Sequence, residues 1–315
     1  MQYTILSRIY HKVVLQKIKV EINTVISYAT WYKYNIKYNK RGKMSESIKA
    51  EVERNLIKKY RRYLWSPFIR ALKEFKLINE GDRVAVAISG GKDSLVLAKL
   101  VQELKKHGEV FFEAKYISMN PGFNKENKDN LLRNCEKMGI PVEMFDTDIF
   151  KSVSEMSAEY PCYMCARMRR GALYGKAESL GCNKLALGHH LNDVNETTLM
   201  NLLYTGCFKT MLPKLKSQNF KNMEIIRPMY YIYEKDIVNF MNFHSLKAMN
   251  CGCKVASGDI VSKRAEVKNL ISILSENNPN LEKCLLKSVK NINLDCCLGW
   301  KYKEKKYNYL DDYES

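Results

Sequence analysis

The chain has 315 residues, enough for one large domain or two ordinary ones with a full hydrophobic core. Its 52 basic residues exceed its 34 acidic ones and give a formal net charge of +18, which favours a polyanionic partner, with nucleic acid ahead of an anionic membrane surface. No apolar run reaches the roughly 18 residues that span a bilayer, and the N-terminus lacks the pattern of a signal peptide. We therefore expect a cytoplasmic protein with no membrane partner, whose ten cysteines are thiols, metal ligands or redox groups rather than disulfides.

The N-terminal part of the chain divides at Met44. Residues 1–43 hold nine basic residues and one acidic residue, and we interpret them as a basic extension upstream of the true start. The alternative is a basic amphipathic helix over residues 10–25 that touches RNA or membrane. Residues 44–80 predict a helical segment. Within it, residues 58–65 alternate cations with aromatics, as RNA-contacting surfaces do, although a solvated helix face explains the charges equally well.

A glycine-rich turn follows the first expected strand, residues 84–88. Residues 89–94 read Ser-Gly-Gly-Lys-Asp-Ser, and a helical pattern continues from there to residue 104. Paired glycines can reach positive φ and leave backbone N–H groups open to an anion, and the helix start adds the positive end of its dipole. The turn lacks the spacing of a Walker loop. We interpret it as a phosphate-binding loop of another kind.

Further strands and helices alternate along the chain. Strands are expected at 111–119, 142–145, 184–187 and 224–226, with a helix at 127–138. This alternation predicts an α/β fold with a doubly wound, parallel, five-stranded sheet over residues 81–275, followed by a C-terminal helix and tail at 276–315. Ligands of such sheets bind at the carboxyl ends of the strands. The loop at 89–94, Met119 and Gly188-His189 should therefore converge.

Two cysteine-containing segments could form one metal site. Cys162 and Cys165 lie three residues apart at a predicted helix start, where helix N–H groups favour thiolates. Such a pair suits zinc, an iron–sulfur cluster or a redox disulfide, and Cys251 or Cys253 in Asn-Cys-Gly-Cys can add a third ligand. All four cysteines together could instead complete a zinc site. Four isolated cysteines are expected to be buried thiols, namely Cys135, Cys182, Cys207 and Cys284.

These motifs follow one another as they do in a known family. The loop at 89–94 resembles the pyrophosphate loop of ATP pyrophosphatases. Three further motifs follow it, namely Pro-Cys-x-x-Cys at 161–165, Arg-x-Arg-Arg-Gly at 167–171 and Leu-Gly-His-His-x-x-Asp-x-x-Glu-Thr at 187–197. In this order, the four motifs resemble those of the TtcA family of tRNA 2-thiocytidine synthetases. The resemblance covers roughly residues 56–273. It implies the PP-loop fold, which is similar to that of adenine nucleotide alpha hydrolases, with helical additions at both ends.

The resemblance also implies cofactors and site residues, namely ATP, Mg²⁺ and a [4Fe–4S] cluster. ATP would be bound by Ser89, Gly90, Gly91, Lys92, Asp93, Ser94, Met119, Gly188 and His189. The catalytic residues would be Lys92, Asp93 and Asp193, the cluster ligands Cys162, Cys165 and Cys251 (alternatively Cys253), and the RNA contacts Arg167, Arg169 and Arg170. A methionine of the hydrophobic core would give the same sequence pattern as Met119. His189 or His190 could instead cap the next helix. The usual Asp-Asp of the family reads Asn192-Asp193 here.

The expected function is thiolation of a tRNA cytidine. ATP would adenylate the base carbonyl, pyrophosphate would leave into the loop, and sulfur would replace the oxygen. The expected partners are tRNA, a cysteine desulfurase or another sulfur donor, and a second copy of the chain in a homodimer. The alternatives are another PP-loop enzyme that thiolates uridine, and an ATP-binding iron–sulfur sensor without turnover.

Overall fold

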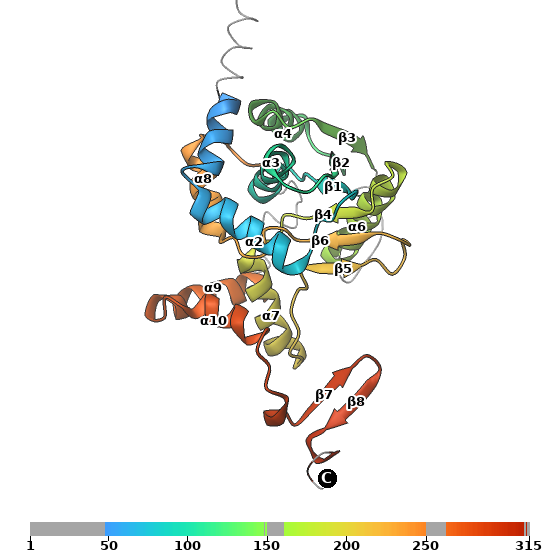
Figure 1. Cartoon of the computed structure of the whole chain (residues 1–315), viewed down its shortest axis with the longest axis vertical. Coiled ribbons are helices and arrows are strands. Elements are labelled where there is room, and N and C mark those ends of the chain that lie inside the picture. Colours follow the sequence, from blue (N-terminus) through green and yellow to red (C-terminus); the bar gives the residue numbers. More distant parts are fainter. Residues whose placement is uncertain (1–47, 148, 150–160, 250–262, 312, 314–315) are drawn as a thin grey trace, which may run out of the picture.

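The protein is described here from a computed structural model that places residues 48–147, 149, 161–249, 263–311 and 313. Its centre is a six-stranded sheet in the order β3-β2-β1-β4-β6-β5 (Figure 1). The strands are β1 (Arg83–Ala87), β2 (Glu113–Asn120), β3 (Val142–Asp146), β4 (Lys184–Ala186), β5 (Lys214–Lys216) and β6 (Glu224–Ile226).

The predicted α/β class and the five parallel strands are confirmed. Parallel pairing joins β3 to β2, β2 to β1, β1 to β4 and β4 to β6. The sixth strand, β5, was not predicted and runs antiparallel to β6 at the sheet edge. The chain leaves β1 towards β2 on one side and later returns to β4 on the other, so the switch point of the topology lies between β1 and β4.

Helices cover both faces of the sheet (Figure 1). Val84 and Val86 of β1 belong to a large core with the helices on one face, whereas Ala85 faces a smaller core with Tyr174 and Ala177 of α6. This alternation follows from the period of two in a strand. The helices between the strands are α3 (Lys92–His107), α4 (Lys125–Met138), α6 (Pro161–Ser179) and α7 (Leu191–Thr205), and α8 (Glu234–Phe243) follows β6.

Additional elements precede and follow the sheet. A helix over residues 48–57 leads into the short π-helical η1 (Arg61–Trp65) and then α2 (Ser66–Phe75). Near the other end, α9 (Lys263–Asn277) and α10 (Leu281–Ser288) pack against α7. The remaining elements are η2 (Leu294–Cys296), the hairpin of β7 (Gly299–Tyr302) and β8 (Lys305–Asn308), and η3 (Tyr309–Asp311).

The hairpin lies away from the sheet in Figure 1 and was not predicted, since the sequence suggested only a helix and tail there. None of the helices within the described ranges is long and apolar enough to cross a membrane.

Candidate nucleotide and sulfur-transfer site

The predicted phosphate loop connects β1 to α3 at the switch point. Gly90 has φ +82°, a conformation that favours glycine, and its carbonyl accepts a hydrogen bond from Met249 N at 2.9 Å. Gly91 is the N-cap of α3 with φ −72°. The expectation that both glycines use positive φ is therefore wrong, because one left-handed residue is enough to turn the chain from strand to helix.

Two serine hydroxyls hold the loop closed. Ser94 Oγ donates to the carbonyl of Gly91 at 2.9 Å and accepts from Ser89 N at 3.1 Å. The Ser89 hydroxyl lies 3.2 Å from Ser94 Oγ and 3.4 Å from Gly91 N. Ser94 is buried. The two hydroxyls expected to contact phosphate thus fix the loop backbone.

The end of β4 lies directly against this loop. A Cβ placed on Gly188 would stand 3.1 Å from the carbonyl carbon of Asp93 and 3.1 Å from Ser94 N, so glycine permits the close approach. The convergence expected at the carboxyl ends of the strands is therefore present for the loop and for Gly188.

A cavity of about 460 Å³ opens at this convergence. It lies among the phosphate loop, the ends of β2 and β4, and the starts of α7 and α9. The residues of the predicted site that line it are Ser89, Gly91, Asp93, Ser94, Met119, Arg169, Gly188, His189 and Asp193. Gly90 and Lys92 of the prediction are not among its lining residues, whereas Arg264 and Met249 are.

The ammonium group of Lys92 lies between two carboxylates. Its Nζ is 3.1 Å from Asp93 Oδ2 and 3.0 Å from Glu234 Oε1, and Glu234 also pairs with Lys268 at 2.7 Å. Burial raises the pKa of Glu234, but the two lysines outweigh it and bring that pKa to about 2. Burial likewise lowers the pKa of Lys92, and its two carboxylates reverse the effect and raise it. Glu234 is therefore a partner of the loop lysine that sequence reasoning missed.

Asp193 has two partners of its own. Its Oδ2 accepts from His190 N at 2.9 Å while His190 Nδ1 accepts from Asp193 N at 3.4 Å, so the two residues form a capping box at the start of α7. Its Oδ1 pairs with Arg264 Nη2 at 2.5 Å, and Arg264 Nε pairs with Glu196 at 2.6 Å. The capping role foreseen for a histidine falls to His190. The contact with Arg264 was not foreseen, because it spans 71 residues.

His189 differs from its neighbour because it faces the cavity. Burial, with the nearby guanidinium of Arg227, lowers the pKa of His189 to about 4, so the imidazole is neutral at pH 7. Its Nδ1 is buried and has no hydrogen-bond partner within the described part of the chain. A neutral imidazole with a free ring nitrogen can bind a polar group of a ligand.

Asp93 offers the best fit to a magnesium ion. Its Oδ1 is buried and lacks a hydrogen-bond partner among the described residues, and it lies 3.7 Å from His190 Nε2. Mg²⁺ bound with nucleotide phosphates typically needs only one or two carboxylates. Within the described ranges, no three His, Cys, Asp or Glu side chains gather as around a metal ion.

The predicted cysteine ligands lie mostly beyond what the structure describes. Cys162 and Cys165 fall in the first turns of α6, where only the backbone is described, and Cys251 and Cys253 lie outside the described residues. Of the isolated cysteines, Cys135 and Cys182 are buried, and burial raises the pKa of Cys135 to about 12. Cys207 and Cys284 are exposed, so their expected burial is wrong.

The predicted RNA-binding segments have different environments. Arg167 and Arg170 are exposed, while Arg169 is partly buried and lines the cavity. At the N-terminal segment, Lys59 Nζ lies 3.3 Å from the ring centroid of Phe243, and the Tyr60 ring meets Phe240 edge to face. Part of the cation–aromatic pattern therefore serves to dock this segment on α8.

Comparisons with known proteins identify the family. Residues 64–250 match the PP-loop domain family. A tRNA-cytidine(32) 2-sulfurtransferase of Syntrophotalea carbinolica is 38% identical over 226 residues, which are 71% of this chain and 86% of that protein. The protein of the same name from Geotalea uraniireducens is 37% identical over 226 residues, 71% of this chain and 88% of its own. The fold is also similar to the U34-tRNA thiolase NcsA from Methanococcus maripaludis with its [4Fe-4S] cluster, with a TM-score of 0.57, 24% identity, and coverage of 76% and 83% of the two chains.

Proposed function

This chain belongs to the TtcA family of PP-loop tRNA-cytidine sulfurtransferases, and from that premise we propose that it converts a tRNA cytidine to 2-thiocytidine with ATP. The nucleotide named for the relatives is cytidine 32, and we propose the same target here. The base oxygen would attack the α-phosphorus of ATP and release pyrophosphate. Sulfur would then attack the activated carbon, and AMP would leave with the oxygen.

One observation supports placing both steps in a single cavity. Residues 250–262, which include Cys251 and Cys253, lie between two described residues, Met249 and Lys263. The N–H of Met249 donates to the carbonyl of Gly90, and Arg264, the residue after Lys263, pairs with Asp193. Both Met249 and Arg264 line the cavity. Position 165 precedes Arg169, another lining residue, by four residues along α6, which is about one helical turn. Described residues next to each cysteine-containing segment therefore line this cavity.

The residues of the cavity would divide the work as follows. Backbone N–H groups at the start of α3 would bind the leaving pyrophosphate. Lys92 would oppose charge that develops on the phosphates, and Asp93 would hold Mg²⁺. His189 and Met119 would border the nucleotide, and Arg169 would orient the RNA beside it.

Cys162, Cys165 and one of Cys251 and Cys253 provide the soft thiolate donor set that an iron–sulfur cluster requires. When bound by these three thiolates, such a cluster would supply an iron site at which sulfur can bind. We further propose that the enzyme acts in the cytoplasm and receives sulfur from a cysteine desulfurase or another donor. Homodimer formation stays a prediction.

The decisive test measures products. Protein purified without oxygen would be incubated with tRNA, ATP, Mg²⁺ and sulfide, and the nucleosides analysed by mass spectrometry. We expect 2-thiocytidine together with AMP and pyrophosphate, and Lys92→Ala should lose most of the rate because charge in the transition state is left uncompensated. ADP and orthophosphate as products would overturn the proposal.

A cysteine series tests the cluster with a matched control. Cys162→Ala and Cys165→Ala should each lose iron, sulfide and the brown absorbance, as should only one of Cys251→Ala and Cys253→Ala, for which we expect Cys251. Cys207→Ala removes an exposed, isolated thiol and should keep the cluster. Colourless wild-type protein with one zinc per chain would refute the cluster and the sulfur-transfer step with it.

A further inference from the structure

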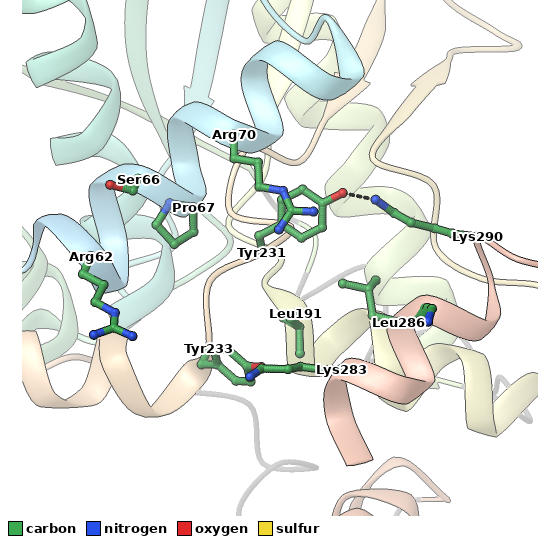
Figure 2. Close-up of a pocket in the computed structure, with 11 residues that line it drawn as sticks. Arg62, Ser66, Pro67, Arg70, Leu191, Tyr231, Tyr233, Lys283, Leu286 and Lys290 are labelled. Carbon is green, nitrogen blue, oxygen red and sulfur yellow. Dashed lines mark hydrogen bonds between the residues drawn. The ribbon is translucent and has the colours of Figure 1, made fainter. Parts of the chain in front are cut away.

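A second, strongly basic pocket lies between the helices that precede the sheet and α10. It has a volume of about 520 Å³ and is bordered by η1, α2, the start of α7, the segment before α8, and α10 (Figure 2). The described residues that line it include five cations and no carboxylate. These cations are Arg62, Arg70, Lys283, Lys287 and Lys290.

The cations come from two helical stripes. Arg62 and Arg70 are eight residues apart along η1 and α2, with Ser66 of the lining halfway between them. Lys283 and Lys287 are four residues apart on α10, and Lys290 follows three residues later. Spacings of three and four residues put side chains on one helix face, where like charges destabilise the helix. Two such stripes facing one pocket repel each other unless an anion lies between them.

Only part of this charge is neutralised internally. Glu74 pairs with Arg70 at 3.3 Å and with Lys290, and the Lys290 ammonium also contacts the hydroxyl of Tyr231 (Figure 2). Arg62, Lys283 and Lys287 have no carboxylate within 4 Å among the described residues, and all three are exposed. Three cations therefore remain for a ligand.

Aromatic rings form the other part of the wall. The Arg70 guanidinium lies 4.3 Å from the ring centroid of Tyr231, and the Lys290 ammonium lies 4.7 Å from the same ring. Tyr233 lies near Lys283 in Figure 2. Tyr231 is buried, so its ring holds the two cations in place, whereas the partly exposed ring of Tyr233 can stack on a base of a nucleic acid.

The pocket is next to the nucleotide cavity. Leu191 lines the pocket, while His189 and Asp193, two residues before and after it, line the cavity. The first turn of α7 therefore separates the two, and a strand of RNA held in the pocket would lie close to the reacting centre.

From the charge, the rings and this position, we propose that the pocket binds backbone phosphates of the tRNA substrate. Arg62 and the three lysines lie outside the matched PP-loop domain, at residues 64–250, so segments that flank this domain contribute four of the five cations of the pocket. The inference rests on the proposed function for the identity of the RNA.

The test compares two double variants that lose the same charge. Lys283→Ala with Lys287→Ala removes two free cations of the pocket, and Lys105→Ala with Lys137→Ala removes two exposed lysines of α3 and α4. Binding of fluorescent unfractionated tRNA would be followed by anisotropy at several salt concentrations without ATP. We expect the slope of log affinity against log salt to become shallower by about one per lysine in the pocket variant, that is, by about two. The control should keep the wild-type slope.

Equal slopes for the pocket variant and the wild type would overturn the inference. Binding of tripolyphosphate would be measured on the same two proteins. If the pocket variant lost tripolyphosphate binding but kept tRNA binding, the ligand would be a free polyanion and the inference would again be overturned. ATP turnover and 2-thiocytidine formation by the wild type report on the proposed function separately. An active wild type beside a pocket variant with unchanged RNA binding would reject the pocket alone.

Discussion

Replacing Gly188 with alanine tests whether the end of β4 must lie directly against the phosphate loop. The added Cβ would stand 3.1 Å from two backbone atoms of Asp93 and Ser94, where ordinary contacts begin near 3.4 Å. No side chain can rotate to relieve this contact, so the start of α3 must shift. Overpacking of this kind typically costs about 1–3 kcal/mol in the free energy of unfolding. Because the same helix start is proposed to bind phosphate, a similar loss in binding energy would weaken ATP affinity by roughly tenfold to a hundredfold.

Gly175→Ala is the matched control, with the opposite expected sign. Gly175 lies inside α6, and nothing lies within 4 Å of the Cβ that alanine would add. Alanine within a helix is more stable than glycine by about 0.5–1 kcal/mol. Denaturant midpoints and calorimetric titration with a non-hydrolysable ATP analogue would measure both variants. G188A with wild-type stability and wild-type nucleotide affinity would refute the reasoning.

Three further changes test the charges around the loop and the core. Glu234→Gln should lower the free energy of unfolding at pH 7, as measured by denaturation. The difference between this variant and the wild type should shrink as pH falls from 4.5 towards 2, because the two lysines stabilise only the ionised carboxylate. His189→Asn should reduce the fall in the free energy of unfolding as pH drops from 6.5 to 4. In the wild type, the histidine of the unfolded chain is protonated in this range while that of the folded chain is not, which favours unfolding. An unchanged pH profile would contradict the lowered pKa. Lys99→Met should lower the free energy of unfolding by about 1–3 kcal/mol, because the carbonyl of Met138 loses a buried donor and Glu53 loses one of its cations. Full stability in thermal melts would reject that role.

The parallel strands could be predicted because each carries a local pattern of apolar residues bounded by turns. β5 carries none: it has three residues, Lys214 and Lys216 surround a half-exposed Leu215, and its pairing with β6 depends on tertiary contact. The same limit applies within α3, which reads as an apolar helix but buries Lys99 completely. The Lys99 ammonium donates to Glu53 and to the carbonyl of Met138, neither of which its own helix reveals.

The site was predictable where its residues belong to a contiguous pattern. Ser89, Asp93, Gly188 and His189 are found through the loop and the strand ends, and the structure brings them around one cavity. Arg264 has no local pattern that connects it with Asp193. Only the packing of α9 on α7 brings these two residues together.

The charges around the cavity are already matched before any nucleotide is considered. Lys92 pairs with Asp93 and Glu234, and Arg264 pairs with Asp193 and Glu196, whose side chain is only 6% exposed. A free polyphosphate would attract the two cations and draw them away from these carboxylates, which are partly or fully buried, and that separation is costly. A nucleotide that binds together with Mg²⁺ provides the metal ion for the carboxylates that lose a partner, and its phosphates for Lys92 and Arg264. We therefore expect the pairing to favour a magnesium–nucleotide complex over the nucleotide alone. Asp93 has one carboxylate oxygen without a hydrogen-bond partner in the described chain, and it is the residue at which we propose that Mg²⁺ binds.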